Sequence, residues 1–305
     1  MRILITGGAG YIGNELVYKL VSNPEIEKII VYDNLSRKNY NLFLDAKYPS
    51  DKIKFVFGEL LDTYKLKKIL QESDIVFHLA ARVTTPFAND DPHLFEQVNH
   101  WGTAELVYAI EQTKTIKKFI FTSSTSIYGE SDNIIDINTL PNPRTFYGTS
   151  KLRGESHIER LFSKMPSYII RSANVYGYSP SLRFDAVINR FMFEANFNNR
   201  ISISGKGEQI RAFIHIDKLV DILYNICFTD FPSGIYNAVD INLSINQIAE
   251  TLKDVFPGLE MIFINQHLNI NKIQVLPDTR IQNIATYPQK TFKDELIDFK
   301  NKFSF

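Results

Sequence analysis

The 305-residue sequence predicts an α/β fold, with a doubly wound parallel sheet followed by a smaller C-terminal lobe. Short apolar runs alternate with longer amphipathic ones along the first two-thirds of the chain, as they do when a helix follows each strand. The short runs are rich in β-branched residues and lack polar alternation, which is typical of strands covered by helices on both faces. After Asn174 this rhythm changes to shorter segments separated by proline and glycine.

Each predicted element follows from this pattern. The first strand covers residues 2–6 and the first helix residues 11–21, where Ile12, Leu16 and Leu20 recur on one helical face. Further strands are expected at residues 28–32, 53–57, 74–79, 118–122 and 167–171. Further helices are expected at residues 63–71, 92–112 and 144–164. The C-terminal part is expected to contain shorter segments at residues 183–197, 201–204, 216–228 and 246–256.

The change of rhythm places a domain boundary near residue 172. At about 150 residues per domain, a chain of 305 residues accommodates one large domain or two closely joined ones. We therefore expect a first domain over residues 1–172, joined by elements from about 210–240, and a smaller lobe over residues 173–305.

The composition argues against several classes of protein. Lysine and arginine total 34, as do aspartate and glutamate, so the formal net charge is zero and offers no global cationic field for nucleic acid. No run approaches the roughly 18 apolar residues of a membrane span. A single cysteine, Cys227, excludes an internal disulfide and a multi-thiolate metal site, and the six histidines lack metal-binding spacing. The first residues lack the layout of a signal peptide, so we expect a cytoplasmic protein that binds no metal, membrane or nucleic acid.

A glycine-rich turn directly follows the first predicted strand and opens the first helix. Gly7, Gly10 and Gly13 are spaced three apart, with Gly8 in addition. Such glycines allow a tight turn, let backbone N–H groups approach a pyrophosphate and present the helix N-terminus to the anion. A tight turn without a ligand would show the same glycines, so their place after the first strand carries more weight than their number. The turn predicts a dinucleotide site of the Rossmann type.

Asp33 ends the second predicted strand, twenty residues after Gly13. A carboxylate at this place accepts hydrogen bonds from both hydroxyls of an adenosine ribose and repels a 2′-phosphate, which favours NAD over NADP. A helix cap or a turn is the other role of an aspartate at a strand end. Arg37 and Lys38 follow closely, and cations here could accommodate the phosphate of NADP.

Three side chains have the chemistry of proton removal from a substrate hydroxyl. Tyr147 and Lys151 stand four residues apart, so on a helix both project from one face. A free phenol has a pKa of about 10, and we expect the Lys151 ammonium and a positively charged nicotinamide to lower it and make Tyr147 a base. This pair alone is common in helices. Ser124 lies just past a strand, where its hydroxyl can stabilise a developing carbonyl oxygen, so we predict Ser124, Tyr147 and Lys151 as the catalytic residues.

At these motifs the chain resembles the extended short-chain dehydrogenase/reductase family, and within it the nucleotide-sugar epimerase/dehydratase branch. The motifs that carry the resemblance lie at residues 7–13, 33–36, 58–60, 78–81, 98–99, 123–129, 147–151, 171–177 and 205–217. The resemblance implies a Rossmann-type fold with NAD as cofactor and a smaller, interleaved lobe that binds a nucleotide sugar. It also implies a homodimer formed through the helix of Trp101 and Tyr108 and the helix of Tyr147.

The resemblance also assigns roles by position. Glu59 and Leu60 lie where the family holds adenine, although aspartate is commoner than glutamate there, and Asn174 and Arg211 would contact the diphosphate of the substrate. The residues predicted to bind the cofactor are Gly7, Gly10, Tyr11, Ile12, Gly13, Asp33, Asn34, Glu59, Leu60, Leu79, Ala80, Ala81, Asn99, Tyr147 and Lys151. The residues predicted to bind the substrate are Ser124, Tyr147, Asn174 and Arg211.

The residues beside Ser124 bear on the type of reaction. By resemblance, 4,6-dehydratases and decarboxylases carry an acid directly after this position, whereas Thr125 and Ser126 follow here. The 3,5-epimerising reductases use a cysteine in an acid/base pair, whereas Cys227 lies far from these motifs. The simplest remaining reaction is NAD-dependent 4-epimerisation, with a UDP-hexose as the default substrate.

Two alternatives remain open. A 4-keto reductase of an unusual nucleotide sugar, with NAD or NADP, would use the same residues. A non-catalytic sensor of NAD or NADP is a second alternative, which the intact set of Ser124, Tyr147 and Lys151 disfavours.

The tail of the chain departs from the family pattern. The family carries an arginine before a Gly–Asp pair, about ten residues before an aspartate that resembles Asp278, and residues 267–272 lack it. Either Lys272 or Arg280 replaces this phosphate contact, or the head group of the substrate differs. Tyr287 and Pro288 also stand where the family has tryptophan and proline.

Overall fold

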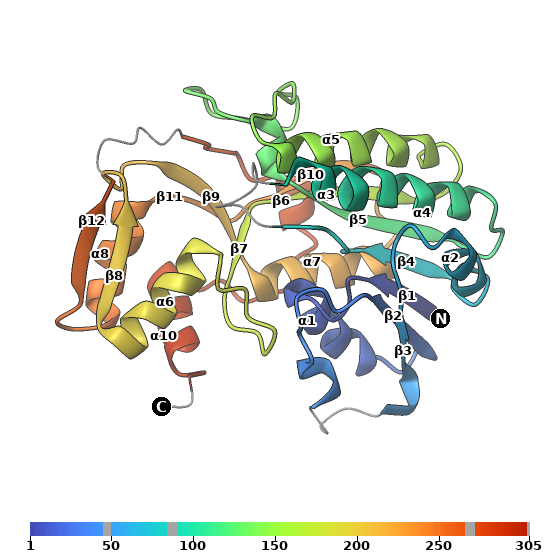
Figure 1. Cartoon of the computed structure of the whole chain (residues 1–305), viewed down its shortest axis with the longest axis horizontal. Coiled ribbons are helices and arrows are strands. Elements are labelled where there is room, and N and C mark those ends of the chain that lie inside the picture. The colour runs from blue at the N-terminus through green and yellow to red at the C-terminus, as the bar shows by residue number, and fades with distance from the viewer. Residues whose placement is uncertain (45–49, 84–90, 266–271, 304–305) are drawn as a thin grey trace.

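The computed structural model describes residues 1–44, 50–83, 91–265 and 272–303. Its core is a seven-stranded sheet of parallel strand pairs in the order β10-β6-β5-β4-β1-β2-β3 (Figure 1). The strands are β1 (Arg2–Thr6), β2 (Lys28–Asp33), β3 (Ile53–Phe57), β4 (Ile75–His78), β5 (Lys118–Ser124), β6 (Ser167–Ser172) and β10 (Gly234–Ala238). The predicted doubly wound fold is confirmed. The strand order reverses between β1 and β4, and ligands of such sheets bind at the carboxyl ends of the strands at this point.

Helices cover both faces of the sheet (Figure 1). On one face α1 (Tyr11–Val21) packs against α7 (Ile216–Phe228), and on the other α4 (Gly102–Glu111) packs against α2 (Thr63–Leu70) and α5 (Phe146–Ile158). The side chains of successive β1 residues point to opposite faces of the sheet. Ile3 and Ile5 belong to the buried apolar cluster that includes α1 and α7, whereas Leu4 belongs to the cluster with α2, α4 and α5. Burial on both faces is why these strands are apolar without alternation.

The helix predicted over residues 92–112 is present but irregular. It begins as α3 (Pro92–Phe95), continues through a π-helical stretch (Glu96–Trp101) and becomes α4 at Gly102. A Cβ on Gly102 would lie 2.9 Å from Leu60 Cβ, so the missing side chain lets this helix approach the segment after β3. Irregular turns of this kind concentrate at functional sites.

The helix predicted over residues 144–164 is shorter than expected. The Thr145 side chain accepts a hydrogen bond from Gly148 N at 3.0 Å, and this N-terminal cap fixes the start of α5 at Phe146. At the other end α5 gives way to a 3₁₀ turn (Glu159–Leu161).

The C-terminal half adds two small sheets and four helices in the part of the chain that is described (Figure 1). The strands are β7 (Asn174–Tyr176), β9 (Ile210–His215) and β11 (Ile241–Ser244) in one sheet, and β8 (Arg200–Ser204) and β12 (Glu260–Ile264) in the other. The helices are α6 (Val187–Asn198), α8 (Ile245–Val255), α9 (Thr279–Gln282) and α10 (Phe292–Lys300). Short 3₁₀ turns also occur at Asn41–Phe43, Ser50–Lys52 and Thr125–Tyr128.

A third buried apolar cluster holds this smaller lobe together, with side chains from α6, α8 and α10. The segment expected over residues 183–197 is helical only from Val187, because the backbone is still extended at the N-cap residue Ala186. β10 pairs with β6 at one edge of the main sheet, so the chain returns to the first domain before the lobe is complete. The division at residue 172 stays a prediction.

Among the residues in these four described ranges, no helix has both the length and the apolar character that a membrane crossing requires.

Candidate active site

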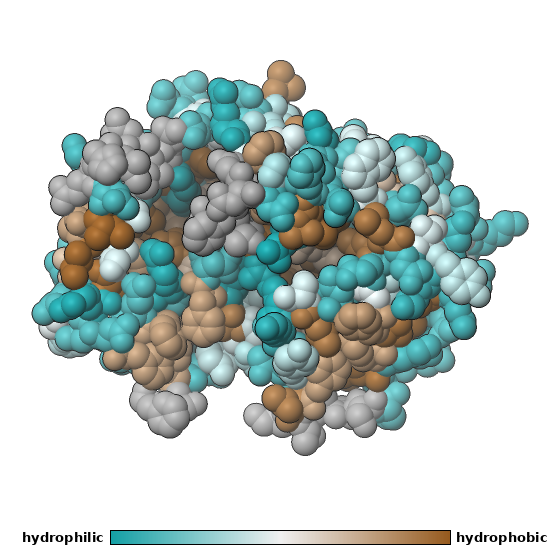
Figure 2. Space-filling view, viewed as in Figure 1, coloured by the Kyte–Doolittle hydropathy of each residue, from teal (hydrophilic) through white to brown (hydrophobic). Residues whose placement is uncertain are grey.

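A cavity of about 880 Å³ lies at the carboxyl ends of the parallel strands. Its walls come from the β1–α1 turn and from the segments that follow β2, β3 and β4, with residues 181–185 of the smaller lobe closing one side. In the space-filling view hydrophilic residues gather along the boundary between the two lobes (Figure 2). The position matches the ligand crevice expected for this topology.

The glycine turn is shaped by close approach of backbone to backbone. Gly7 has a φ of +73°, and a Cβ there would lie 2.5 Å from Ala80 N. A Cβ on Gly13 would lie only 2.4 Å from Gly7 O, whereas one on Gly10 would meet only that oxygen, at 3.1 Å. Gly10 is the N-cap of α1, so no capping side chain covers the helix terminus on the cavity side. This arrangement leaves room for a pyrophosphate at the helix N-terminus.

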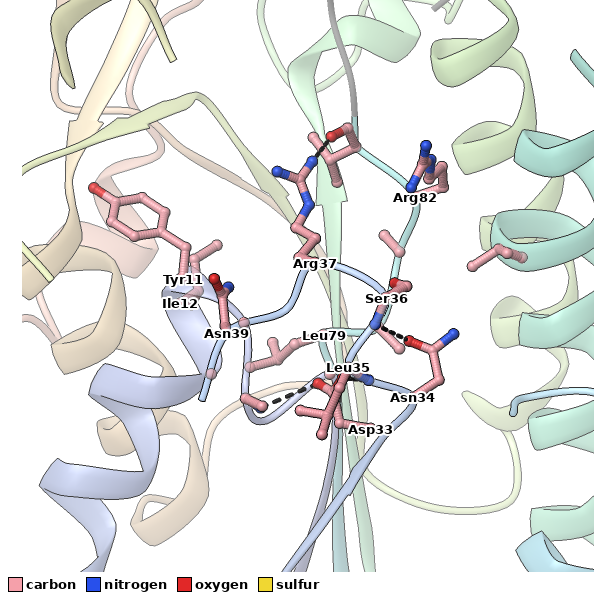
Figure 3. Close-up of a pocket in the computed structure, with 18 of the residues that line it drawn as sticks. Tyr11, Ile12, Asp33, Asn34, Leu35, Ser36, Arg37, Asn39, Leu79 and Arg82 are labelled. Atoms are coloured by element: carbon pink, nitrogen blue, oxygen red, sulfur yellow. Dashed lines mark hydrogen bonds between the residues drawn. The ribbon is translucent and has the colours of Figure 1, made fainter. Parts of the chain in front are cut away.

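Asp33 lines the same cavity at the end of β2 (Figure 3). Its Oδ2 accepts a hydrogen bond from Ala9 N at 3.1 Å and its Oδ1 one from Leu35 N at 2.8 Å. Burial raises the pKa of Asp33, while these backbone hydrogen bonds act in the opposite direction. The carboxylate is therefore held in place by the main chain at the spot where a ribose would hydrogen-bond. The glycine turn, the open helix terminus and Asp33 together fit a dinucleotide.

Most of the predicted cofactor residues lie on this cavity. Those that line it are Gly7, Gly10, Tyr11, Ile12, Gly13, Asp33, Asn34, Glu59, Leu60, Leu79, Ala80 and Ala81. The Asn34 side chain donates to both carboxylate oxygens of Glu59, at 3.0 and 3.1 Å, which fixes one wall. Asn99 is fully buried behind the wall instead, where it bonds both Arg82 N and Arg82 O. Asn99 thus shapes the segment after β4 rather than facing the cavity.

A second cavity, about 410 Å³, is lined by residues of both lobes, including Tyr147. The tyrosine side chain, 7% exposed, comes from α5 and contacts Phe95 of α3. Ser124 ends β5, and its Oγ lies 3.1 Å from both Ser126 N and Ser126 Oγ. Ser124 also lies near enough to the Tyr147 phenol to oppose the rise in its pKa that burial causes. The structure therefore brings Ser124 and Tyr147 together, as the sequence argument requires.

Lys151 lies one helical turn after Tyr147 on α5. Its Nζ donates to Thr122 O at 2.6 Å and lies 4.0 Å from the centre of the Phe121 ring. Burial lowers the pKa of Lys151 to about 7. Burial also raises the pKa of Tyr147, and Arg183, Ser124 and Arg37 oppose that rise, so the predicted effect of Lys151 on this pKa stays a prediction. The physical reason for both burial effects is desolvation, which disfavours both the ammonium and the phenolate.

A buried ion pair anchors the helix that carries Tyr147. Arg171 on β6 donates to Glu155 on α5 at 2.7 Å, and both side chains are almost fully buried. Arg171 also donates to the Tyr128 hydroxyl at 2.8 Å, which in turn donates to Asn237 of β10. The pair therefore fixes α5 relative to the strands and to the turn after Ser124.

Three of the four predicted substrate contacts, Tyr147, Asn174 and Arg211, line the second cavity, whereas Ser124 is not among its lining residues. Asn174 and Arg211 both line it, and Asn174 Nδ2 donates to Ala212 O at 3.0 Å, so adjacent strands hold the two side chains together. Burial lowers the pKa of Arg211, and Glu130 opposes this. Three further arginines that the sequence argument did not select also line the cavity: Arg144, Arg183 and Arg190. Arg183 and Arg190 stand just after the 171–177 motif, and this adjacency is the signal that could have found them.

The two residues considered as replacements for the absent family arginine do not reach this cavity. Arg280 donates to both carboxylate oxygens of Asp278, at 2.9 and 2.5 Å, and lies over the Tyr236 ring. Neither Arg280 nor Lys272 is among the described residues that line the cavity. Residues 266–271, most of the tail segment that departs from the family pattern, lie outside the described residues.

The parallel sheet, the glycine turn with Asp33, and a buried tyrosine beside a serine define the class: a Rossmann-type dinucleotide-dependent enzyme. The chain belongs to the NAD dependent epimerase/dehydratase family, whose model matches residues 3–238. The predicted cofactor, NAD, is confirmed by this membership.

Individual relatives differ in activity. The chain is 29% identical to a dTDP-D-glucose 4,6-dehydratase of Bos taurus, over 96% of this chain and 82% of that one. It is 31% identical to a UDP-glucose 4-epimerase of Mycolicibacterium smegmatis, over 72% of this chain and 71% of that one. Among solved structures it is similar to a UDP-glucuronic acid 4-epimerase of Bacillus cereus in complex with UDP-glucuronic acid and NAD, with a TM-score of 0.87 and 25% identity over 99% of this chain and 98% of that one.

Proposed function

We propose that the chain catalyses NAD-dependent epimerisation at C4 of a nucleotide-diphosphate sugar, with a UDP-hexose as the default substrate. The observation that carries this proposal is the set of side chains around Ser124. The serine lies beside the Tyr147 phenol and acts to lower its pKa, and the next two residues, Thr125 and Ser126, offer hydroxyls to the cavity but no carboxylate. This set can move a proton on one hydroxyl, whereas dehydration needs a further acid to eliminate water.

The chain's own groups account for the proton transfers. Tyr147 removes the proton from the C4 hydroxyl of the sugar, and Ser124 donates a hydrogen bond to the oxygen as it becomes a carbonyl. NAD, when bound, would supply the hydride acceptor for C4. The 4-keto sugar then presents its other face, Tyr147 gives the proton back to the C4 oxygen, and the cofactor ends unchanged. The residues that would hold NAD are those of the glycine turn, Asp33 and the wall around Glu59.

The charges of the second cavity favour a diphosphate. Arg211 and Asn174 lie together on its wall, and a guanidinium can donate two parallel hydrogen bonds to a phosphate. The relatives named above act on dTDP-D-glucose, UDP-glucose and UDP-glucuronic acid, and all three are nucleotide-diphosphate sugars.

We further propose a cytoplasmic homodimer that pairs through α4 and α5. Trp101, directly before α4, is 54% exposed and stacks on His100. His100 also stacks on His157 of α5. An aromatic cluster of this kind on two adjacent helices suits an interface between copies. Light scattering on the purified chain tests this by giving its mass in solution.

Incubation with single sugar nucleotides and no added cofactor tests the reaction. UDP-glucose, UDP-glucuronic acid and dTDP-glucose are each supplied in heavy water, and the products are identified by NMR and mass spectrometry. We expect repeated turnover to a 4-epimer of unchanged mass without deuterium at carbon, because the same hydride leaves and returns. A product lighter by one water with deuterium at C5 would show a dehydratase. In a parallel incubation, oxidation to a 4-keto sugar in proportion to added NAD or NADP would show a 4-keto reductase running in reverse.

The cofactor preference gives a further expected outcome. Replacing Asp33 by asparagine removes the charge that repels a 2′-phosphate, while the amide oxygen can still accept one of the two backbone hydrogen bonds. We expect the preference for NAD over NADP to fall about 10-fold, equivalent to about 1.4 kcal/mol. Dissociation constants of both cofactors measured by calorimetry check this, and an unchanged ratio would mean that Asp33 does not face the ribose.

A further inference from the structure

Three charged side chains connect the two lobes at the cofactor cavity. Arg37 comes from the loop after β2, whereas Arg183 and Asp185 come from the segment between β7 and α6. Asp185 Oδ1 accepts hydrogen bonds from Arg183 Nε at 3.0 Å and from Arg37 Nη1 at 3.4 Å. Arg37 also donates to the carbonyl of Val83, so its guanidinium is held on two sides (Figure 3). One carboxylate thus joins two arginines that stand 146 positions apart in the sequence.

The group lies where the two cavities meet. Arg183 and Asp185 line both cavities, Arg37 lines the cofactor cavity, and Tyr147 lines the substrate cavity. The side chains of Arg183 and Asp185 are only 19% and 21% exposed. An ion pair shielded to this extent is less screened than one on the open surface, so it holds its geometry better.

Asp185 is kept in its charged form by its two partners. Burial acts to raise its pKa, but Arg183 and Arg37 together hold that pKa below its ordinary value. Its other oxygen, Oδ2, is buried without a hydrogen-bond partner in the described part of the chain. The carboxylate therefore has one oxygen committed to the arginines and one that can accept a hydrogen bond from a bound ligand.

The electrostatic surroundings of Tyr147 point to the same arginines. Burial raises the pKa of Tyr147, and Arg183 is the strongest group that opposes this, followed by the Ser124 hydrogen bond and Arg37. Lys151, one helical turn away, instead donates to Thr122 O. The other charged side chains that line the cavity with Tyr147 are Glu130, Arg144, Asp185, Arg190 and Arg211.

We infer that Arg37, Asp185 and Arg183 form a positioning bridge, in which Asp185 holds the Arg183 guanidinium at the junction of the cavities, where it assists proton removal by Tyr147. Because Arg37 stands four residues after Asp33, the bridge links the adenosine end of the cofactor cavity to the catalytic tyrosine. The catalytic part of this inference rests on the proposed function, whereas the linkage itself does not.

The protonation of Tyr147 can be followed without any turnover. Protein labelled with ¹³C at the tyrosine ζ carbon is titrated by NMR, and the Tyr147 signal is assigned by its loss in Tyr147→Phe. We expect Arg183→Gln to raise the titration midpoint by about one pH unit, because a cation near the phenolate is lost. Arg37→Gln should raise it by a smaller amount.

Asp185→Asn separates positioning from simple charge. Loss of an anion near Tyr147 would by itself favour the phenolate and lower the midpoint, whereas release of Arg183 from its place raises it. We expect the midpoint to rise, and a midpoint that falls or stays unchanged would overturn the bridge. Arg200→Gln is the matched control, since Arg200 forms an exposed ion pair with Glu260 at 2.8 Å in the same lobe and should change nothing.

Turnover provides the second readout. In Arg183→Gln and Asp185→Asn we expect kcat to fall about 10-fold, with its acidic limb moved to higher pH and KM changed less, and Arg183→Lys should restore part of the rate. If Arg183 and Asp185 had a purely structural role, their replacement would lower the melting temperature without moving the acidic limb of the pH profile of kcat. If Arg183→Gln or Asp185→Asn fails to fold, Arg37→Gln provides the test, because it leaves the Asp185–Arg183 pair intact. A raised Tyr147 midpoint in Arg37→Gln supports the bridge, and an unchanged one overturns it. If the chain shows no epimerase activity, the NMR titration still supports or overturns the bridge, so the two proposals fail separately.

Discussion

Replacing Tyr147 by phenylalanine is expected to lower the turnover of the proposed epimerisation about 1,000-fold. The substitution removes only the phenolic oxygen, which in the proposed mechanism takes the proton from the C4 hydroxyl, and which lies beside Ser124. The ring, its packing against Phe95 and the backbone of α5 stay in place. Initial rates with a UDP-hexose measure the loss.

The matched control is Tyr64→Phe, because Tyr64 on α2 is 83% exposed and lines neither cavity. This control should retain full activity. Both variants should keep the melting temperature and the NAD affinity of the unmodified chain. A Tyr147→Phe protein that still turned over at a comparable rate would remove the base from the proposed mechanism, and the sensor interpretation would then gain support.

Six of the seven strands of the main sheet could be predicted from sequence because each is a local apolar run, whereas β10 was not predicted. Strands β1, β2, β4, β5 and β6 each contain four to six consecutive buried residues, as expected for strands covered on both faces, whereas the edge strand β3 is only partly buried. The short strands of the smaller lobe carry no such signal. In β11 every residue is only partly buried, and its pairing with β9 brings together residues about 30 positions apart. Such elements form because of tertiary contacts that no single window of sequence contains.

The cofactor half of the site could also be predicted from the sequence, whereas the substrate half could be predicted only in part. Gly7, Gly13 and Asp33 are recognisable because their spacing encodes one continuous strand–turn–helix–strand geometry. The joining of Arg37 to Arg183 through Asp185 depends on how the two lobes meet, which local spacing does not encode. The predicted effect of Lys151 on the pKa of Tyr147 stays a prediction for a related reason: spacing places two side chains on one helical face, whereas burial shifts the pKa of each.

The glycine turn gives the second large expected effect. In Gly13→Ala the new Cβ would lie 2.4 Å from Gly7 O and 2.6 Å from Gly8 Cα, and both contacts are backbone atoms that cannot turn aside. The turn and the first helix must then separate, which we expect to cost about 1–3 kcal/mol of folding free energy. Because the same turn is proposed to receive the pyrophosphate of NAD, we expect NAD affinity to fall about 100-fold. Thermal melting and calorimetric titration with NAD measure the two effects.

Gly10→Ala distinguishes packing from cofactor approach within the same turn. Its Cβ would meet only Gly7 O, at 3.1 Å, so the fold can absorb it with a shift of a few tenths of an ångström. Gly10 lines the cofactor cavity at the N-terminus of α1, where a methyl group occupies space next to the pyrophosphate. We therefore expect Gly10→Ala to keep the melting temperature and lose NAD affinity, whereas Gly13→Ala loses both. Equal melting temperatures in the two variants would contradict the close contact at Gly13, and an unchanged NAD affinity in Gly10→Ala would place the pyrophosphate elsewhere.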